Sequence, residues 1–177
     1  MGLGAAEGGL DPDVSVLQPR PPGGESLASL RTWLPGHVAP KLAIEVASES
    51  NPNKDYAQAP DKYAASGTEE LWIFDPLLVG PRAHGGPLRL QVWRRTEGSF
   101  VREYAGEGPA WSEALGAWAV VTEGGKLLRV AASADGSGLW PTEAEAARAA
   151  SEGARAEVEA LRAQLREAQA ELAKRSG

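Results

Sequence analysis

Short segments of apolar residues, separated by glycine and proline, divide the first half of the chain. Residues 13–16 alternate between polar and apolar directly after Pro12, which predicts a short strand. Residues 42–46 alternate in the same way between turn signals, and their β-branched side chains favour a second strand. Residues 70–74 form a strongly apolar third strand that ends at Asp75.

A helix is predicted between the second and third strands. Residues 55–66 carry apolar side chains about one turn apart, and Gly67 follows in a position suited to end a helix. Pro60 has no N–H group, so the helix either kinks there or properly begins near Ala59. A strand, a helix and a further strand predict a βαβ unit with parallel strands. Residues 26–34 show spacing for a short helical turn.

The pattern changes to clean alternation after residue 87. Residues 88–95 and 100–104 alternate on either side of a turn-forming Thr-Glu-Gly segment, which predicts an antiparallel hairpin. Residues 118–121 and 126–130 indicate a second hairpin. Parallel strands joined by one crossover helix, together with these hairpins, predict an α/β fold with a mixed sheet and an antiparallel extension.

The end of the chain is helical. Thr142–Glu145 has the form of a capping box. The domain organisation predicted from these patterns is a flexible tail over residues 1–9, an α/β domain over 10–130, a linker over 131–141 and a helix over 142–175.

The predicted C-terminal helix has a heptad pattern. Its apolar residues are spaced 4-3-4-3-4, which is an a/d register of a coiled coil, at Ala154, Val158, Leu161, Leu165, Ala168 and Leu172. In a parallel pair, Glu157 would face Arg162 of the second copy. A single solvated helix, or one folded back on the domain, are the alternatives. We expect a homodimer through residues 142–175, because so polar a helix has little else to bury.

Composition narrows the function classes. The chain has 177 residues, no cysteine and a net charge of −6, so it has no disulfide framework and no thiolate zinc site. No apolar run approaches the roughly 20 residues of a membrane span, and no signal-peptide pattern opens the chain, so a cytoplasmic location is expected. A nucleic-acid binder would need a local basic patch, and the predicted hairpin offers one at Arg89, Arg94, Arg95 and Arg102.

Glu45 departs from the apolar pattern of its strand. A buried carboxylate needs a partner, which could be a metal ion or an arginine, unless that face of the strand is exposed to solvent. Asp13 lies at the start of the first predicted strand. If the two strands are neighbours, both carboxylates can meet at one divalent cation. Oxygen ligands favour Mg²⁺ or Mn²⁺, and such a site suits phosphodiester hydrolysis.

Several ordered motifs make the chain similar to a known family. They are Pro12–Val16, Pro40–Ser48, Asp55, Tyr63-Ala64, Gly67 and Glu69–Pro76. Through these motifs, residues 10–121 resemble the putative restriction endonuclease family of the PD-(D/E)xK nuclease superfamily. The resemblance implies a restriction-endonuclease-like mixed sheet with a flanking helix. It also implies Asp13 and Glu45 as metal ligands, and Mg²⁺-dependent cleavage of DNA.

The chain departs from the family pattern at its lysine and at its N-terminus. Ala47 and Ala59 stand where the superfamily's simplest pattern and this family have the catalytic lysine. Lys62 is nearly on the same helix face as Asp55 and could substitute, or it is an ordinary solvated lysine. The helix and strands that precede the Pro-Asp strand in the family are missing, which predicts marginal stability or a partner. The alternative function is therefore a catalytically inactive binding or oligomerisation module.

Overall fold

The computed structural model describes residues 11–21 and 35–175. The flexible tail predicted over residues 1–9 and the helical turn predicted over 26–34 lie outside the described residues. The chain divides into two compact units, Met1–Leu139 and Trp140–Gly177. The first unit holds both sheets and the short helices, and the second holds one long helix.

A five-stranded sheet forms the middle of the first unit. Its strands follow the order of the sequence, and only β2 and β3 pair in parallel, whereas the other neighbours are antiparallel. The mixed sheet predicted from the sequence is therefore confirmed. The strands are β1 (Val14–Val16), β2 (Leu42–Val46), β3 (Glu70–Phe74), β4 (Leu90–Thr96) and β5 (Ser99–Gly106).

The crossover between the parallel strands is a π-helix, η1 (Lys54–Gln58), followed directly by α1 (Ala59–Ser66). Pro60 occupies the first turn of α1, where a missing N–H costs least. The N–H of Ala59 donates to the carbonyl of Lys54, five residues back, which is the wider π-type bond. The predicted start of the regular helix near Ala59 is confirmed, and so is its end at Gly67, whose φ is +91°.

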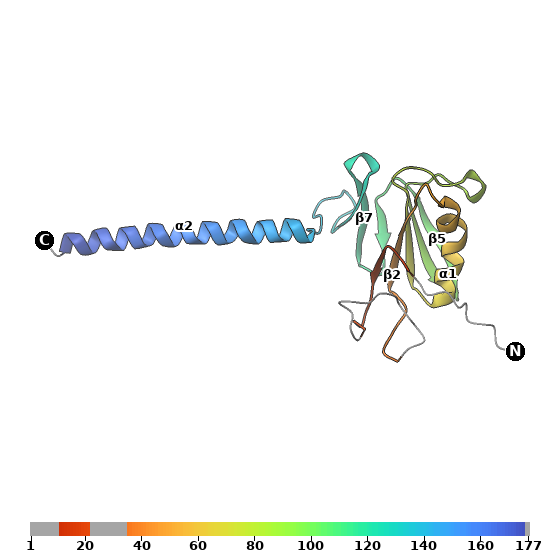
Figure 1. The fold of residues 1–177 in the computed structure, drawn as a ribbon, viewed down its shortest axis with the longest axis horizontal. Helices are drawn as coiled ribbons and strands as arrows, with labels where there is room; N and C mark the ends of the chain where they lie inside the picture. Colours follow the sequence, from red (N-terminus) through yellow and green to blue (C-terminus); the bar gives the residue numbers. More distant parts are fainter. Residues whose placement is uncertain (1–10, 22–34, 176–177) are drawn as a thin grey trace. The chain divides into compact units, whose positions relative to one another are not determined.

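A second, three-stranded antiparallel sheet packs on the other side of the first. It consists of β6 (Ala110–Ser112), β7 (Ala117–Thr122) and β8 (Leu127–Ala131), and the 3₁₀ turn η3 (Glu123–Gly125) joins β7 to β8. Another 3₁₀ turn, η2 (Arg82–His84), lies between β3 and β4 of the five-stranded sheet. Figure 1 shows α1 and the β7 sheet on opposite sides of the five-stranded sheet. The β7–β8 hairpin was predicted. The pattern did not predict β6, in which Trp111 pairs with Trp118.

Two hydrophobic layers follow from this sandwich. The middle strand β3 is covered on both faces, so its successive residues are buried on opposite sides. The layer under α1 contains Ala43, Ala47, Tyr56, Ala59, Tyr63, Leu71 and Ile73. The layer between the two sheets contains Leu42, Trp72, Leu90, Val92, Ala110 and Ala119.

A buried carboxylate joins the two sheets. Glu70, which is 1% exposed, accepts a hydrogen bond from the indole of Trp72 and one from the hydroxyl of Ser112 at 2.5 Å. The backbone N–H groups of Glu113 and Ala114 donate to its second oxygen. These bonds satisfy a charge that would otherwise be costly to bury, and they connect β3 to the end of β6.

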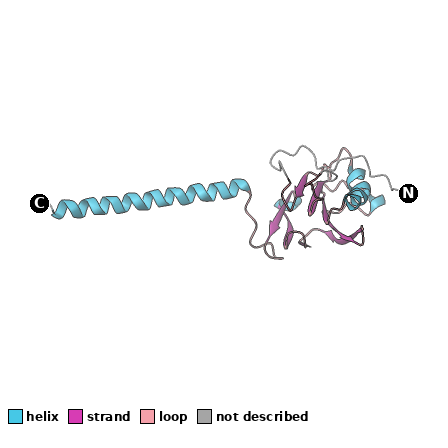
Figure 2. Ribbon diagram, turned by 90° about the horizontal axis from the view of Figure 1, so that it is seen from below, coloured by secondary structure: helices cyan, strands magenta, loops and turns pink. Residues whose placement is uncertain are grey.

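The second unit is the helix α2 (Glu143–Arg175), shown as one unbroken helix in Figure 2. The predicted capping box is confirmed, because the N–H of Thr142 donates to Glu145 at 2.7 Å and the N–H of Glu145 donates back to the Thr142 hydroxyl at 3.2 Å. Every described residue of α2 is exposed. Within the described ranges, no helix is long and apolar enough to cross a membrane.

Candidate active site

The pairing of β1 with β2 brings Asp13 and Glu45 together. Val14 pairs with Ile44 in antiparallel register, so Asp13, one residue earlier, stands opposite Glu45. The carboxylate of Asp13 accepts a hydrogen bond from the backbone N–H of Val46 at 2.7 Å. Burial is the largest cause of the raised pKa of Glu45, and the negative charge of Asp13 adds to it. The two residues singled out as metal ligands therefore lie next to each other.

Glu45 points into the layer beneath α1. Its side chain is 4% exposed, so the alternative of an outward-facing glutamate is wrong. The apolar alternation of β2 did not reveal this, because α1 covers the face that would otherwise be wet. The hydroxyl of Tyr63 donates to Glu45 Oε1 at 2.5 Å. Burial raises the pKa of Glu45, while the Tyr63 hydrogen bond and the charge of Lys54 act in the opposite direction.

Asp55 is a third carboxylate at this place. It lies in the π-helix and is 4% exposed. Burial raises its pKa, the charge of Lys54 lowers it, and the charge of Asp13 raises it further. Backbone hydrogen bonding from Ser48 also lowers this pKa. Asp55 belongs to the motifs that carry the family resemblance, but its spacing in the sequence did not indicate that it would approach Asp13.

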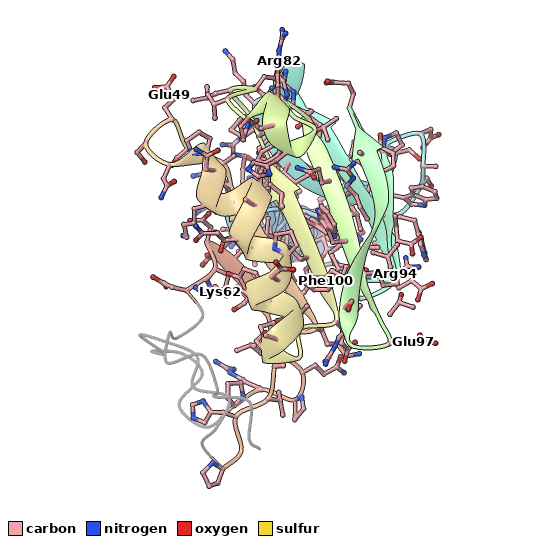
Figure 3. All side chains as sticks on the ribbon, turned by 90° about the vertical axis from the view of Figure 1, so that its right-hand side faces the viewer. Glu49, Lys62, Arg82, Arg94, Glu97 and Phe100 are labelled. Atoms are coloured by element: carbon pink, nitrogen blue, oxygen red, sulfur yellow. The ribbon has the colours of Figure 1, made fainter. Side chains whose placement is uncertain are left out.

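Two lysines are candidates for the site, and the structure relates only Lys54 to these carboxylates through its charge. Lys62 is half-buried on α1, and Figure 3 shows it on the side of the helix opposite to Phe100. Lys54 is exposed, and its positive charge lowers the pKa of both Glu45 and Asp55. Sequence reasoning missed Lys54, because its position in a π-turn cannot be read from helical spacing. Ala47 and Ala59, where the family patterns have lysine, are buried in the layer beneath α1.

The carboxylate oxygens of Asp13 and Glu45 suit a hard cation that keeps other ligands, such as water, in addition to the protein. Asp13 is held through Oδ2 and Glu45 through Oε1, so each carboxylate has a second oxygen that could face an ion. In the part of the chain that the structure describes, no three Asp, Glu, His or Cys side chains gather closely enough to enclose a metal ion. Mg²⁺ is commonly bound by one or two carboxylates together with water and substrate phosphates, which is compatible with this pair.

The predicted arginine patch does not form one surface. Arg89 donates to the carbonyl of Pro76 at 2.7 Å, and Arg94 forms an ion pair with Glu113 at 3.4 Å. Arg102 lies over the ring of Trp93, with 5.4 Å from its guanidinium carbon to the ring centroid. Alternate residues of a strand point to opposite faces, so arginines on one hairpin are divided between the two sides of the sheet.

A groove of about 690 Å³ lies on the other side of α1 from the carboxylates. Its walls include Pro60 and Asp61 of α1, and Trp93, Phe100 and Arg102 of the hairpin. Neither Asp13 nor Glu45 lines it, so we do not place the chemistry there.

A mixed sheet crossed by a βαβ connection, with carboxylates at one end of the parallel pair, is consistent with a nuclease-like α/β fold. The model of the Uma2 family, described as "Putative restriction endonuclease", matches residues 2–111. The match covers more than half of the chain, so the chain belongs to this family. It ends within β6, and β7, β8 and α2 lie beyond it. No curated protein matches the chain.

Proposed function

We propose that this protein is a divalent-metal-dependent DNA endonuclease that hydrolyses phosphodiester bonds. Membership of the restriction endonuclease family supports a nuclease and supports DNA as its partner. The observation that carries the proposal is the position of Asp13 opposite Glu45, with Asp13 fixed on the Val46 N–H. A cytoplasmic location is part of the proposal, because DNA is the proposed substrate.

Asp13 and Glu45 are the proposed ligands of Mg²⁺ or Mn²⁺. A bound divalent ion would supply Lewis-acid polarisation of the phosphoryl oxygen and would lower the pKa of a water molecule. The protein contributes the position of its carboxylates. The Tyr63 hydroxyl fixes the orientation of Glu45, and the Val46 N–H fixes that of Asp13. Asp55 adds negative charge beside them, which strengthens the attraction for a cation.

A lysine completes the proposed site. Lys62 is the candidate from the sequence, and it would assist the attacking water or stabilise charge on the leaving group. Lys54 is a second candidate, because its charge already acts on Glu45 and on Asp55. A variant of each residue distinguishes the two.

The test is conversion of supercoiled plasmid DNA to the nicked form, with Mg²⁺ or Mn²⁺ and with a chelator. We expect nicking that requires the metal and is lost in Asp13→Asn and in Glu45→Gln, which keep the shape of the side chain. Asp61→Asn is the matched control, because Asp61 is an exposed aspartate in the groove on the other side of α1. Nicking that persists in both site variants would refute the proposal.

Calorimetry separates binding of the metal from catalysis. Titration of Mg²⁺ or Mn²⁺ into the wild-type protein should release or absorb heat with a saturable isotherm, and Glu45→Gln should lose it. An identical isotherm in wild type and variant would remove Glu45 from the set of ligands.

The second candidate function is an inactive nuclease-fold module that binds or oligomerises. The observation that favours it is that both family lysine positions are buried alanines, Ala47 and Ala59. This candidate predicts no nicking with either metal, together with self-association that disappears when residues 142–177 are deleted. A homodimer through residues 142–175 is compatible with both candidates, and we propose it in each case.

A further inference from the structure

The helix α2 exposes a continuous apolar stripe. Its larger members are Val158, Leu161 and Leu165, which are 46%, 57% and 58% exposed. They occupy alternating a and d positions of the heptad, so they lie on one side of the helix. A helix in water gains stability from packing such a face against a partner.

The charges beside the stripe differ between its two flanks. The e positions next to the stripe carry Arg148, Arg155, Arg162 and Gln169, whereas the g positions carry Ala150, Glu157, Gln164 and Glu171. One flank is therefore basic or neutral, and the other is acidic or neutral. In coiled coils, the e and g residues determine which partner is chosen and in which direction it runs.

The two possible directions of a pair use these flanks differently. In a parallel pair, g residues of one helix face e residues of the other, so Glu157 faces Arg162 of the second copy. In an antiparallel pair, e faces e and g faces g, which places arginine against arginine and glutamate against glutamate. Opposite charges attract in the first arrangement, and like charges repel in the second.

We propose that α2 pairs in parallel with α2 of a second copy of this chain, through the stripe from Ala154 to Leu172. The charge pattern on its two flanks selects the second copy and the direction. Alanine at two of the core positions makes the seam narrow, so the pair dissociates on dilution.

The direction determines where the two nuclease units are tethered. The first unit ends at Leu139 and α2 begins at Glu143, so each unit is attached at the N-terminal end of its helix. A parallel pair tethers both units at the same end. An antiparallel pair would tether them about 50 Å apart, the length of 33 residues at 1.5 Å each. If the proposed function holds, the parallel pair brings two catalytic sites to one DNA duplex.

Cysteine cross-linking of the full chain tests the direction, since the natural sequence contains no cysteine. Ala168→Cys introduces a thiol at a d position near the C-terminal end of the stripe. We expect it to form a disulfide with itself in a second copy under mild oxidation. Ala163→Cys, on the opposite face of α2, is the matched control and should cross-link far less. Equal cross-linking of the two variants, or none by Ala168→Cys, would overturn the parallel pair.

Sedimentation equilibrium tests the stripe and its charges. The mass should rise from one chain toward two with concentration, and Leu161→Glu should keep it at one chain while Ala163→Glu should not. Arg162→Glu alone should weaken the pair by placing glutamate opposite Glu157, and Glu157→Arg in the same chain should restore it. A mass of one chain at every concentration overturns the proposal, and so does a stronger pair in Arg162→Glu. None of these measurements depends on DNA cleavage.

Discussion

Tyr63 donates its hydroxyl hydrogen to Glu45 Oε1 at 2.5 Å, and both side chains are buried beneath α1. Burial raises the pKa of the Tyr63 hydroxyl, and the hydrogen bond to the Glu45 carboxylate raises it further. The phenol therefore stays protonated over the whole working pH range and remains a donor. It fixes one oxygen of Glu45, so α1 positions a carboxylate that belongs to β2.

Replacing Tyr63 by phenylalanine should affect both stability and chemistry. The loss of a buried, charge-assisted hydrogen bond should lower the free energy of unfolding by about 1–3 kcal/mol in urea denaturation. The pKa of Glu45 should rise, because this hydrogen bond lowers it. The pH at which nicking begins should therefore move upward.

Tyr104→Phe is the control for the Tyr63 variant. The Tyr104 hydroxyl accepts a hydrogen bond from the Gly108 N–H at 2.7 Å, so this variant also loses a hydrogen bond, but Tyr104 packs against the layer between the two sheets rather than the layer beneath α1. It should lose stability without a change in the pH profile of nicking. Equal displacement of the two profiles would mean that Tyr63 acts only on the fold.

Glu45→Gln should make the metal-free protein more stable at neutral pH. Because the folded pKa of Glu45 is raised above 4.5, the folded state holds this proton more tightly than the unfolded chain. The resulting stability is present below pH 4.5 and is lost as the pH rises through the folded pKa. Glutamine keeps an oxygen for Tyr63 and carries no charge.

Thermal unfolding in a chelator, from pH 4 to pH 8, checks this prediction. The midpoint of Glu45→Gln should exceed that of the wild type increasingly as the pH rises. The exposed Glu69→Gln should follow the wild type throughout. A variant that is less stable at pH 8 than at pH 4, relative to wild type, would contradict the assignment of a raised pKa.

Lys54→Met and Lys62→Met should differ in activity. We expect the Lys54 variant to lose more nicking, on the order of 100-fold, because its charge acts on two carboxylates. Initial nicking rates at saturating Mg²⁺ give the comparison, and circular dichroism confirms that both variants fold. A larger loss in Lys62→Met would return the role to the lysine indicated by the sequence.

Glu70→Ala should weaken the junction between the two sheets. It removes the acceptor of Trp72, Ser112 and two backbone N–H groups, and it leaves these donors buried. We expect a loss of about 3 kcal/mol or more in the free energy of unfolding. Glu103→Ala, on an exposed position of β5, should change it little.

Gly153→Ala should stabilise α2. Gly153 lies in the helix, and a Cβ added there would meet no atom within 4 Å. Alanine should favour the helix by about 0.5–1 kcal/mol. Far-ultraviolet circular dichroism of the full chain during heating should show helix retained to a higher temperature. An unchanged melting curve would contradict the position of Gly153 inside a solvent-exposed stretch of helix.

The sequence predicted those elements whose apolar period is regular. The β2–α1–β3 unit, the β4–β5 hairpin and the start of α2 follow from alternation, helical spacing and a capping box. The face on which Glu45 lies could not be read from β2, because that depends on α1 packing above it. The separation of Arg94 from Arg102 could not be read from the sequence either. The patch was predicted from arginines that are close in sequence, but a strand directs neighbouring residues to opposite faces of the sheet.

Lys54, the second candidate lysine, escaped prediction for a different reason. Helical spacing assumes 3.6 residues per turn, and this indicated Lys62 as the partner of Asp55. The π-turn before Pro60 changes the rotation per residue, so the direction of Lys54 cannot be derived from that spacing. Approach of Asp55 to Asp13 depends on the same turn.

The hydrogen bonds to Glu70 determine where this chain can be shortened for recombinant expression. A recombinant fragment trimmed to the matched residues 2–111 would stop one residue before Ser112, and so would lack three of the four groups that donate hydrogen bonds to this buried glutamate. Such a product should be insoluble or prone to proteolysis. The sensible boundary for expression lies after β8, beyond Ala131.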